Sequence, residues 1–161
     1  MQIVSWNCRG LGNPIKAEAV KYLMRMAPFD ILLLQETNIE EEVLLLLSKS
    51  KWKLTASKAV SARGSCGGLA TLWRDEKFQL KKIYATQHWI HTELFHHSNK
   101  TSYTLFNLYV PVNYSEKQDC WKTLSYFLEF SSPANIILAG DMNITLSPNE
   151  KKGGLRGKDF M

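Results

Sequence analysis

Short apolar runs alternate with amphipathic stretches in the first part of the chain. Residues 2–7 (QIVSWN) have the pattern of a strand, and the turn-rich CRGLGNP follows them. Asn13 and Pro14 are the residue types of a helix N-cap and a first helical residue, so a helix is predicted from residue 15 until Pro28 stops it. Its expected buried face has apolar residues at helical spacing, namely Ile15, Ala19, Tyr22, Leu23 and Met26.

Three further elements are predicted before residue 60. Residues 30–36 (DILLLQE) form a compact apolar run between two acids, which is typical of a strand buried on both faces. Residues 40–50 (EEEVLLLLSKS) predict a second helix, with acids in its first turn and a lysine in its last. Residues 52–57 (WKLTAS) indicate a short strand.

The second half of the chain is dominated by strand-like segments. Four of them lie at residues 69–73, 78–85, 89–97 and 102–110, and the last two flank SNKT as a hairpin. Ser115 is expected to cap a third helix with Trp121, Leu124 and Leu128 on one face, and residues 134–141 (ANIILAGD) predict another buried strand. Helices that alternate with apolar strands predict an α/β fold, and the hairpin predicts mixed sheets.

Composition narrows the class of protein. A length of 161 residues suits one domain over residues 1–161, and 45% hydrophobic with 22% charged residues is ordinary for a globular chain. A net charge of +5 mildly favours a polyanionic partner. The cysteines Cys8, Cys66 and Cys120 lack zinc spacing and indicate a reducing compartment. Without a signal peptide or membrane-length apolar run, we expect an intracellular protein, nuclear or cytoplasmic, with no membrane partner.

Polar side chains follow four of the apolar strands. They are Asn7, Glu36, Asp141 with Asn143 two residues later, and Tyr109 with Asn113 just beyond. Because ligand sites in α/β folds collect beyond the carboxyl ends of strands, these side chains are candidates for one site. A single Asn or Asp after a strand is more often a turn residue, but glutamate has no special turn chemistry. Carboxylates and amides without a Ser–His or Cys–His pair favour an oxygen-liganded Mg²⁺.

The stretches IVSWNCRGLG, DILLLQET, GGLATLW, NLYVPVN and ILAGDMNITLSPNEKKGG resemble the endonuclease/exonuclease/phosphatase superfamily. More narrowly, they are similar to the apurinic-type endonuclease domain of plant LINE-type (non-LTR) retrotransposons, in the same order along the chain. The resemblance implies a four-layer α/β sandwich, with two mixed sheets flanked by helices and an incomplete C-terminal part. It also implies magnesium-dependent cleavage of DNA, with Mn²⁺ as an alternative ion, and a reverse transcriptase downstream in an intact element.

The resemblance also assigns roles by motif position. Glu36 would be the main metal ligand, assisted by Asn7. Asp141 would orient and deprotonate the attacking water, and Asn143 would hold that water or the scissile phosphate. Both are also expected among the metal ligands. Tyr109 would contact the phosphate near the leaving oxygen. These roles match what phosphodiester hydrolysis requires, which is charge neutralisation, a positioned nucleophile and a stabilised leaving group.

Two departures from the family pattern bear on activity. The resemblance would make Asn113 a substrate-binding residue, but one extra residue separates it from Tyr109-Val110-Pro111, compared with relatives that have Tyr-x-Pro-Asn. The chain also contains no late Ser-Asp-His motif, so we expect a truncated copy with little or no nuclease activity. The four histidines are expected to be ordinary strand and turn residues, at His88, His91, His96 and His97.

The sequence is consistent with more than one role for the basic residues and with more than one function. Arg9 could meet DNA phosphates, together with basic residues of the tail at Lys151, Lys152, Arg156 and Lys158, although a solvated loop explains the tail equally well. Besides a retrotransposon endonuclease, two other functions are consistent with the sequence. One is a phosphatase of the same superfamily that acts on a phosphorylated small molecule or lipid, and the other is a DNA-binding remnant without catalysis.

Overall fold

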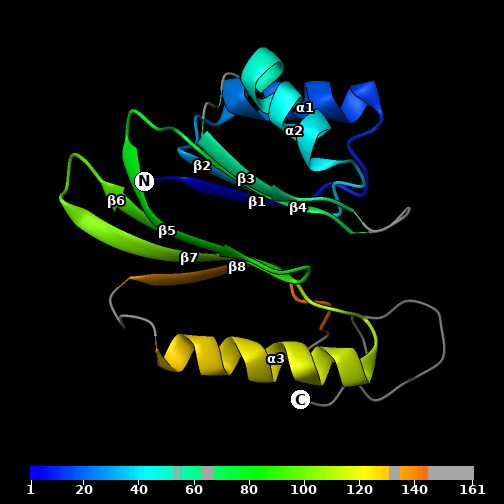
Figure 1. The fold of residues 1–161 in the computed structure, drawn as a ribbon. Helices are drawn as coiled ribbons and strands as arrows, with labels where there is room; N and C mark the ends of the chain where they lie inside the picture. Colours follow the sequence, from blue (N-terminus) through cyan, green and yellow to red (C-terminus); the bar gives the residue numbers. More distant parts are fainter. Residues whose placement is uncertain (53, 55, 63–66, 131–134, 145–161) are drawn as a thin grey trace.

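The protein is a four-layer α/β sandwich. The structure is a computed structural model that describes residues 1–52, 54, 56–62, 67–130 and 135–144. Two sheets of four strands each stack face to face, and helices cover their outer faces, so the layers run helix, sheet, sheet, helix (Figure 1). The architecture predicted from the sequence, two mixed sheets flanked by helices, is confirmed.

The first sheet contains the early strands in the order β1-β2-β4-β3. These strands are β1 (Ile3–Asn7), β2 (Ile31–Gln35), β3 (Ala56–Val60) and β4 (Leu69–Trp73). Helix α1 (Pro14–Met26) connects β1 to β2, which are parallel, whereas β4 runs antiparallel to β2 and β3. Helix α2 (Glu41–Leu47) and the short π-helix η1 (Ser48–Trp52) lie on the same outer face as α1.

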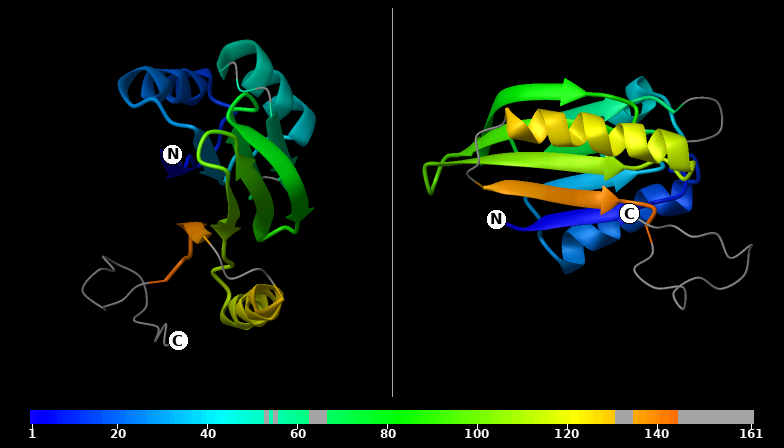
Figure 2. Two further views of the ribbon diagram at one scale, coloured as in Figure 1. Left: turned by 90° about the vertical axis from the view of Figure 1, so that its left-hand side faces the viewer. Right: turned by 90° about the horizontal axis from the view of Figure 1, so that it is seen from below.

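The second sheet contains the later strands in the order β5-β6-β7-β8. These strands are β5 (Phe78–Ala85), β6 (Trp89–His96), β7 (Thr101–Tyr109) and β8 (Ile136–Asp141). The first three form an antiparallel meander, and helix α3 (Tyr114–Glu129) returns the chain so that β8 is parallel to β7. Seen from below, α3 crosses the outer face of this sheet (Figure 2).

Alternation along the strands divides the interior into three apolar layers. In β2, Leu32 and Leu34 pack with the α1–α2 side, whereas Ile31 and Leu33 pack against the other sheet. In β7, Phe106 packs toward α3. Both faces of β2 are therefore buried, and each fully buried leucine contributes roughly 1.5–3 kcal/mol relative to an exposed one.

The predicted buried face of α1 is only partly correct. Leu23 packs against the core as expected, but Ile15, Tyr22 and Met26 are 77%, 59% and 67% exposed, and the fully buried residues of the helix are Ala17 and Val20. Apolar side chains surround much of this helix, so spacing alone did not select one face. The small Ala17 brings the helix close to η1, where the indole Nε1 of Trp52 donates a hydrogen bond to the Ala17 carbonyl at 3.0 Å.

Two other local expectations are also corrected. The strand predicted at residues 52–57 overlaps β3 only at Ala56 and Ser57, because Trp52 ends η1 and is buried beside α1. The N-cap of α3 is Asn113 rather than Ser115, since the Asn113 Oδ1 accepts hydrogen bonds from two backbone amides of the first turn. Asparagine is among the best N-cap residues, so it takes this position before the serine can.

The remaining strands lie within a residue or two of their predicted bounds, whereas most of the predicted C-terminal loop lies outside the described residues. None of the helices described is both long enough and apolar enough to cross a bilayer.

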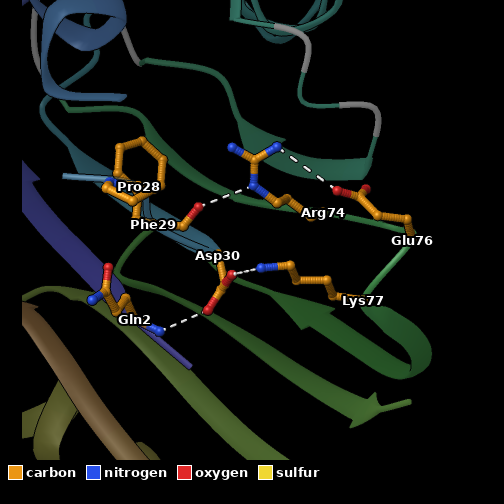
Figure 3. A pocket seen from close by; sticks show the side chains of 7 residues that line it. All are labelled: Gln2, Pro28, Phe29, Asp30, Arg74, Glu76 and Lys77. Carbon is orange, nitrogen blue, oxygen red and sulfur yellow. Dashed lines mark hydrogen bonds and ion pairs between the residues drawn. The ribbon is translucent and has the colours of Figure 1, made fainter. Parts of the chain in front are cut away.

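A hollow of about 450 Å³ lies where β1 and β2 begin, at the opposite end from Asn7 (Figure 3). Asp30 sits in it and accepts hydrogen bonds from the Gln2 backbone amide at 2.8 Å and from the Lys77 ammonium. Burial raises the pKa of Asp30, but the bonds from Lys77 and Gln2 outweigh it and the pKa is lowered. Arg74 pairs with Glu76 beside it. The charges of this hollow therefore satisfy one another.

The lowered pKa of Asp30 predicts a pH-dependent contribution to stability. A carboxyl with a lower pKa in the folded state stabilises the fold above its unfolded pKa of about 4, and this contribution is lost as the pH falls through the folded pKa. Asp30→Asn should lower the free energy of unfolding at pH 7 by about 1–2 kcal/mol. Urea denaturation should show the difference from wild type shrinking towards pH 3.

The matched control is Glu76→Gln, because the Glu76 side chain is 61% exposed and contacts Arg74 only at 3.7 Å. This variant should stay within about 0.5 kcal/mol of wild type at both pH values. An Asp30→Asn deficit that is the same at pH 3 and pH 7 would contradict the assignment.

Candidate active site

Asn7 joins the carboxylates of Glu36 and Asp141. Its Nδ2 donates hydrogen bonds to the Glu36 Oε1 at 2.9 Å and to the Asp141 Oδ2 at 2.6 Å. Asn7 ends β1 and Glu36 follows β2 in the first sheet, whereas Asp141 ends β8 in the second. The structure therefore brings together three of the residues that the sequence placed at strand ends, and their contact spans both sheets.

Strand periodicity explains why these side chains meet between the sheets. Ile3 packs in the apolar layer between the sheets, and Asn7 is four residues later on the same face of β1. Ile137 and Asp141 have the same relation along β8. Tyr109 pairs in register with Asp141 and so lies at the same end of the second sheet. The layer between the sheets thus changes from apolar to polar at the carboxyl ends of these strands.

A buried amide bridge separates the apolar layer from the site. The Gln35 Nε2 donates to the Asn107 Oδ1 at 2.6 Å, across the two sheets. The Asn107 Nδ2 in turn donates to the Ala70 carbonyl at 2.8 Å, and both amide side chains are essentially inaccessible. Sequence reasoning missed this pair, although an amide inside the apolar runs ILLLQ and TLFNLY was the available signal. The bridge holds one sheet against the other immediately behind Glu36.

Glu36 has an unusual backbone conformation. Its φ is +50°, in the left-handed region that residues other than glycine seldom occupy, and such strain concentrates at functional sites. The carbonyl of Glu36 accepts a hydrogen bond from the Gly10 amide at 2.6 Å, and the Cys8 thiol lies 3.6 Å from the same oxygen.

The loop after β1 is held beside Glu36. Burial raises the pKa of Cys8 to about 11, so the thiol keeps its proton. Lys16 lies on α1 and holds this loop in place, because its Nζ donates a hydrogen bond to the Cys8 carbonyl at 2.9 Å.

The turn after β8 is held at several points. Gly140 precedes Asp141 with φ +140°, and a Cβ there would lie 2.1 Å from the Leu108 carbonyl, so only glycine allows this pairing with β7. Asn143 is left-handed with φ +47°. Its backbone amide donates to the Asp141 Oδ1 at 3.0 Å, and its Nδ2 donates to the Val110 carbonyl at 2.7 Å. Both oxygens of Asp141 therefore accept hydrogen bonds.

Of the other predicted site residues, Tyr109 and Arg9 lie next to this centre. Tyr109 is half-buried, and its backbone amide donates to the His88 carbonyl at 2.7 Å. Arg9 is exposed, and its backbone amide donates to the Asn7 Oδ1 at 3.3 Å. Asn113 caps α3, so a contact with substrate remains a prediction. The basic residues predicted in the tail lie outside the described residues, as does Cys66.

The histidines take the strand and turn positions expected of them. His91 is buried in β6, with ring centroids 5.0 Å from Phe106 and 4.9 Å from Phe127. Burial lowers its pKa. His96 ends the same strand and meets the ring of Phe78 edge to face.

The donors of the site suit a hard cation. Within the described part of the chain, no three His, Cys, Asp or Glu side chains come together, and no Lys or Arg forms an ion pair with Glu36 or Asp141. The Glu36 Oε2 accepts no hydrogen bond from a described residue. Two carboxylates without a counter-charge fit Mg²⁺, which uses one or two carboxylates with substrate phosphate, and do not fit a zinc site. Asn7 turns its nitrogen towards both carboxylates, so direct ligation by Asn7 remains a prediction.

Comparison with known proteins identifies the family. The model of the endonuclease/exonuclease/phosphatase family matches residues 4–160. The chain belongs to this family. Its members are nucleases, phosphatases and phosphodiesterases that generally use divalent metal ions.

One curated relative comes from a mobile element. The transposon TX1 uncharacterized 149 kDa protein of Xenopus laevis is 28% identical over 159 residues, which is 94% of this chain and 12% of that protein. The match therefore concerns a small part of a much longer protein.

Solved structures share the fold. The 3'-5' exonuclease NExo of Neisseria meningitidis has a TM-score of 0.68 and 20% identity, over 89% of this chain and 58% of that chain. An AP endonuclease of Archaeoglobus fulgidus has a TM-score of 0.70 and 17% identity, over 93% of this chain and 62% of that chain. At these identities the likeness establishes the fold alone, and this chain spans about three fifths of their length.

The two hydrogen bonds donated by Asn7 predict how the site responds to a third carboxylate. Asn7→Asp replaces a double donor by an acceptor next to Glu36 and Asp141, so like charges meet where two hydrogen bonds were. In EDTA, the free energy of unfolding from urea denaturation should fall by about 2 kcal/mol, and Mg²⁺ should recover part of the loss.

Asn113→Asp is the control, because Asn and Asp are equally good N-caps, and its unfolding free energy should change by less than about 0.5 kcal/mol. If Asn7→Asp is as stable as wild type in EDTA, the two hydrogen bonds of Asn7 do not hold the carboxylates together.

Proposed function

We propose that the protein is the endonuclease domain of a LINE-type retrotransposon, which hydrolyses DNA phosphodiester bonds with Mg²⁺. The observation that carries the proposal is the pair of carboxylates, Glu36 and Asp141, which come from different sheets and accept hydrogen bonds from the same amide nitrogen of Asn7. No cationic side chain of the described residues neutralises them. A divalent ion and a phosphate group would complete such a site.

The residues divide the work of hydrolysis between them. A bound Mg²⁺ would neutralise charge on the phosphoryl oxygens. Glu36 would hold the ion, and Asn7 fixes the orientation of both carboxylates. Asp141, anchored by Asn7 and the Asn143 amide, orients a water molecule and accepts its proton. Asn143 and Tyr109 contact the scissile phosphate, Tyr109 on the side of the leaving oxygen.

DNA is the substrate that the similarities and the charge favour. The Xenopus relative is a transposon protein, a Neisseria relative of this fold is bound to a product DNA hairpin, and a Danio relative is bound to a single strand DNA product. The net charge of +5 and the exposed Arg9 beside Asn7 suit a polyanion. A plant source, a nuclear or cytoplasmic location and a downstream reverse transcriptase remain predictions from the sequence motifs.

A plasmid-nicking assay tests the proposal. Residues 1–161 are incubated with supercoiled DNA in Mg²⁺, and nicking should disappear in EDTA. Glu36→Gln and Asp141→Asn should each lower the rate by about a hundredfold or more, since each removes a carboxylate that the reaction needs.

The control is Glu42→Gln, which changes an exposed carboxylate of α2 and should leave the rate unchanged. Nicking that survives both site substitutions would overturn the assignment of the site. Hydrolysis of a phosphorylated small molecule or lipid without nicking would favour the phosphatase alternative. Salt-dependent DNA binding without turnover, unaffected by Glu36→Gln, would indicate a DNA-binding remnant.

A further inference from the structure

Lys117 is a buried lysine on α3. It is 8% exposed and shares the buried face of the helix with Cys120 and Leu124. Lysine is almost never buried unless its charge has a partner. A positive charge near the start of a helix also opposes the helix dipole. A lysine at this position is therefore not expected to stabilise α3 by itself. The contact made by its ammonium explains why it is there.

The ammonium of Lys117 reaches the turn that follows β8. Its Nζ donates to the carbonyl of Asn143 at 2.7 Å. Asn143 is also tied through its backbone amide to the Asp141 Oδ1 and through its Nδ2 to the Val110 carbonyl. Three hydrogen bonds from three directions thus hold a residue whose left-handed backbone is strained. A hydrogen bond from a charged donor is the strongest kind in this set.

We propose that Lys117 is a positioning residue for the candidate active site. It holds the Asn143 carbonyl, which keeps the Asn143 amide on one oxygen of Asp141 while Asn7 holds the other. Without the ammonium, Asn143 can relax from its strained conformation, and its amide then leaves Asp141. Lys117 acts on Asp141 through Asn143. Its importance for catalysis rests on the proposed function, whereas its effect on the turn does not.

Removing the charge of Lys117 should change the turn at Asn143 without changing the free energy of unfolding of the whole protein. Lys117→Met retains the length and packing of the side chain and removes the charge, and replacing a buried charge by an apolar group is often neutral for the fold. The free energy of unfolding should therefore change little. The backbone amide of Asn143 should lose protection, because it depends on the position that Lys117 maintains.

Amide hydrogen exchange measured by NMR on the full 161-residue chain tests the proposal. In Lys117→Met, the Asn143 amide should exchange about tenfold faster, the factor that corresponds to loss of one charged hydrogen bond. Lys117→Arg keeps a buried cationic donor and should restore part of the protection. Lys122→Met is the matched control, because Lys122 lies on the same helix with its side chain 76% exposed, and it should leave the Asn143 amide unchanged.

Two results would overturn the proposal. One is an Asn143 exchange rate in Lys117→Met equal to that of wild type. The other is a rise in exchange of the same size at amides throughout α3 and β8, with a matching loss of global stability, which would make Lys117 a general structural residue. Because exchange requires no turnover, an inactive chain still gives an answer. If Lys117→Met changes exchange only at Asn143 and the wild-type chain does not nick DNA, the proposed function is contradicted but the positioning role of Lys117 is supported.

Discussion

The amide of Asn7 is the contact on which the candidate site depends. Two carboxylates from different sheets, Glu36 and Asp141, share its two hydrogens. This contact requires the register of β1, because a slip of one residue would turn Asn7 towards the helices and leave the carboxylates facing each other without a donor. The candidate site therefore depends on strand pairing as much as on the identity of three side chains.

The layer between the sheets changes character along its length. Ile31 and Leu33 pack against the second sheet at one end, the Gln35–Asn107 bridge follows, and the carboxylates come last. This order of side chains places the charged groups at the end of a rigid, packed layer, and precise positioning requires such a rigid frame. Glu36 and Asn143 are two of the six non-glycine residues with a left-handed backbone among those described, and neighbouring hydrogen bonds hold both of them.

Simple periodicities in the sequence sufficed for most helices and strands and for placing the candidate residues at strand ends, whereas the four layers followed from the resemblance to the family. Asn7, Glu36 and Asp141 follow apolar strands, and the carboxyl ends of such strands collect at one edge of a fold. Such periodicities did not suffice for residues whose roles depend on distant partners. Lys117 meets Asn143 26 residues later, and Gln35 meets Asn107 72 residues later. No local pattern encodes such contacts, although a lysine in an apolar stripe and an amide in an apolar strand were visible signs.

The central claim is that Glu36 and Asp141 act as one cation site held by Asn7. Calorimetric titration of Mg²⁺ into wild type, Glu36→Gln, Asp141→Asn and the double variant tests it most directly. The account predicts that each single variant loses most of the Mg²⁺ affinity and that the double variant loses little more, since coupled groups give non-additive effects. Mg²⁺ binding to both single variants with wild-type affinity would contradict it.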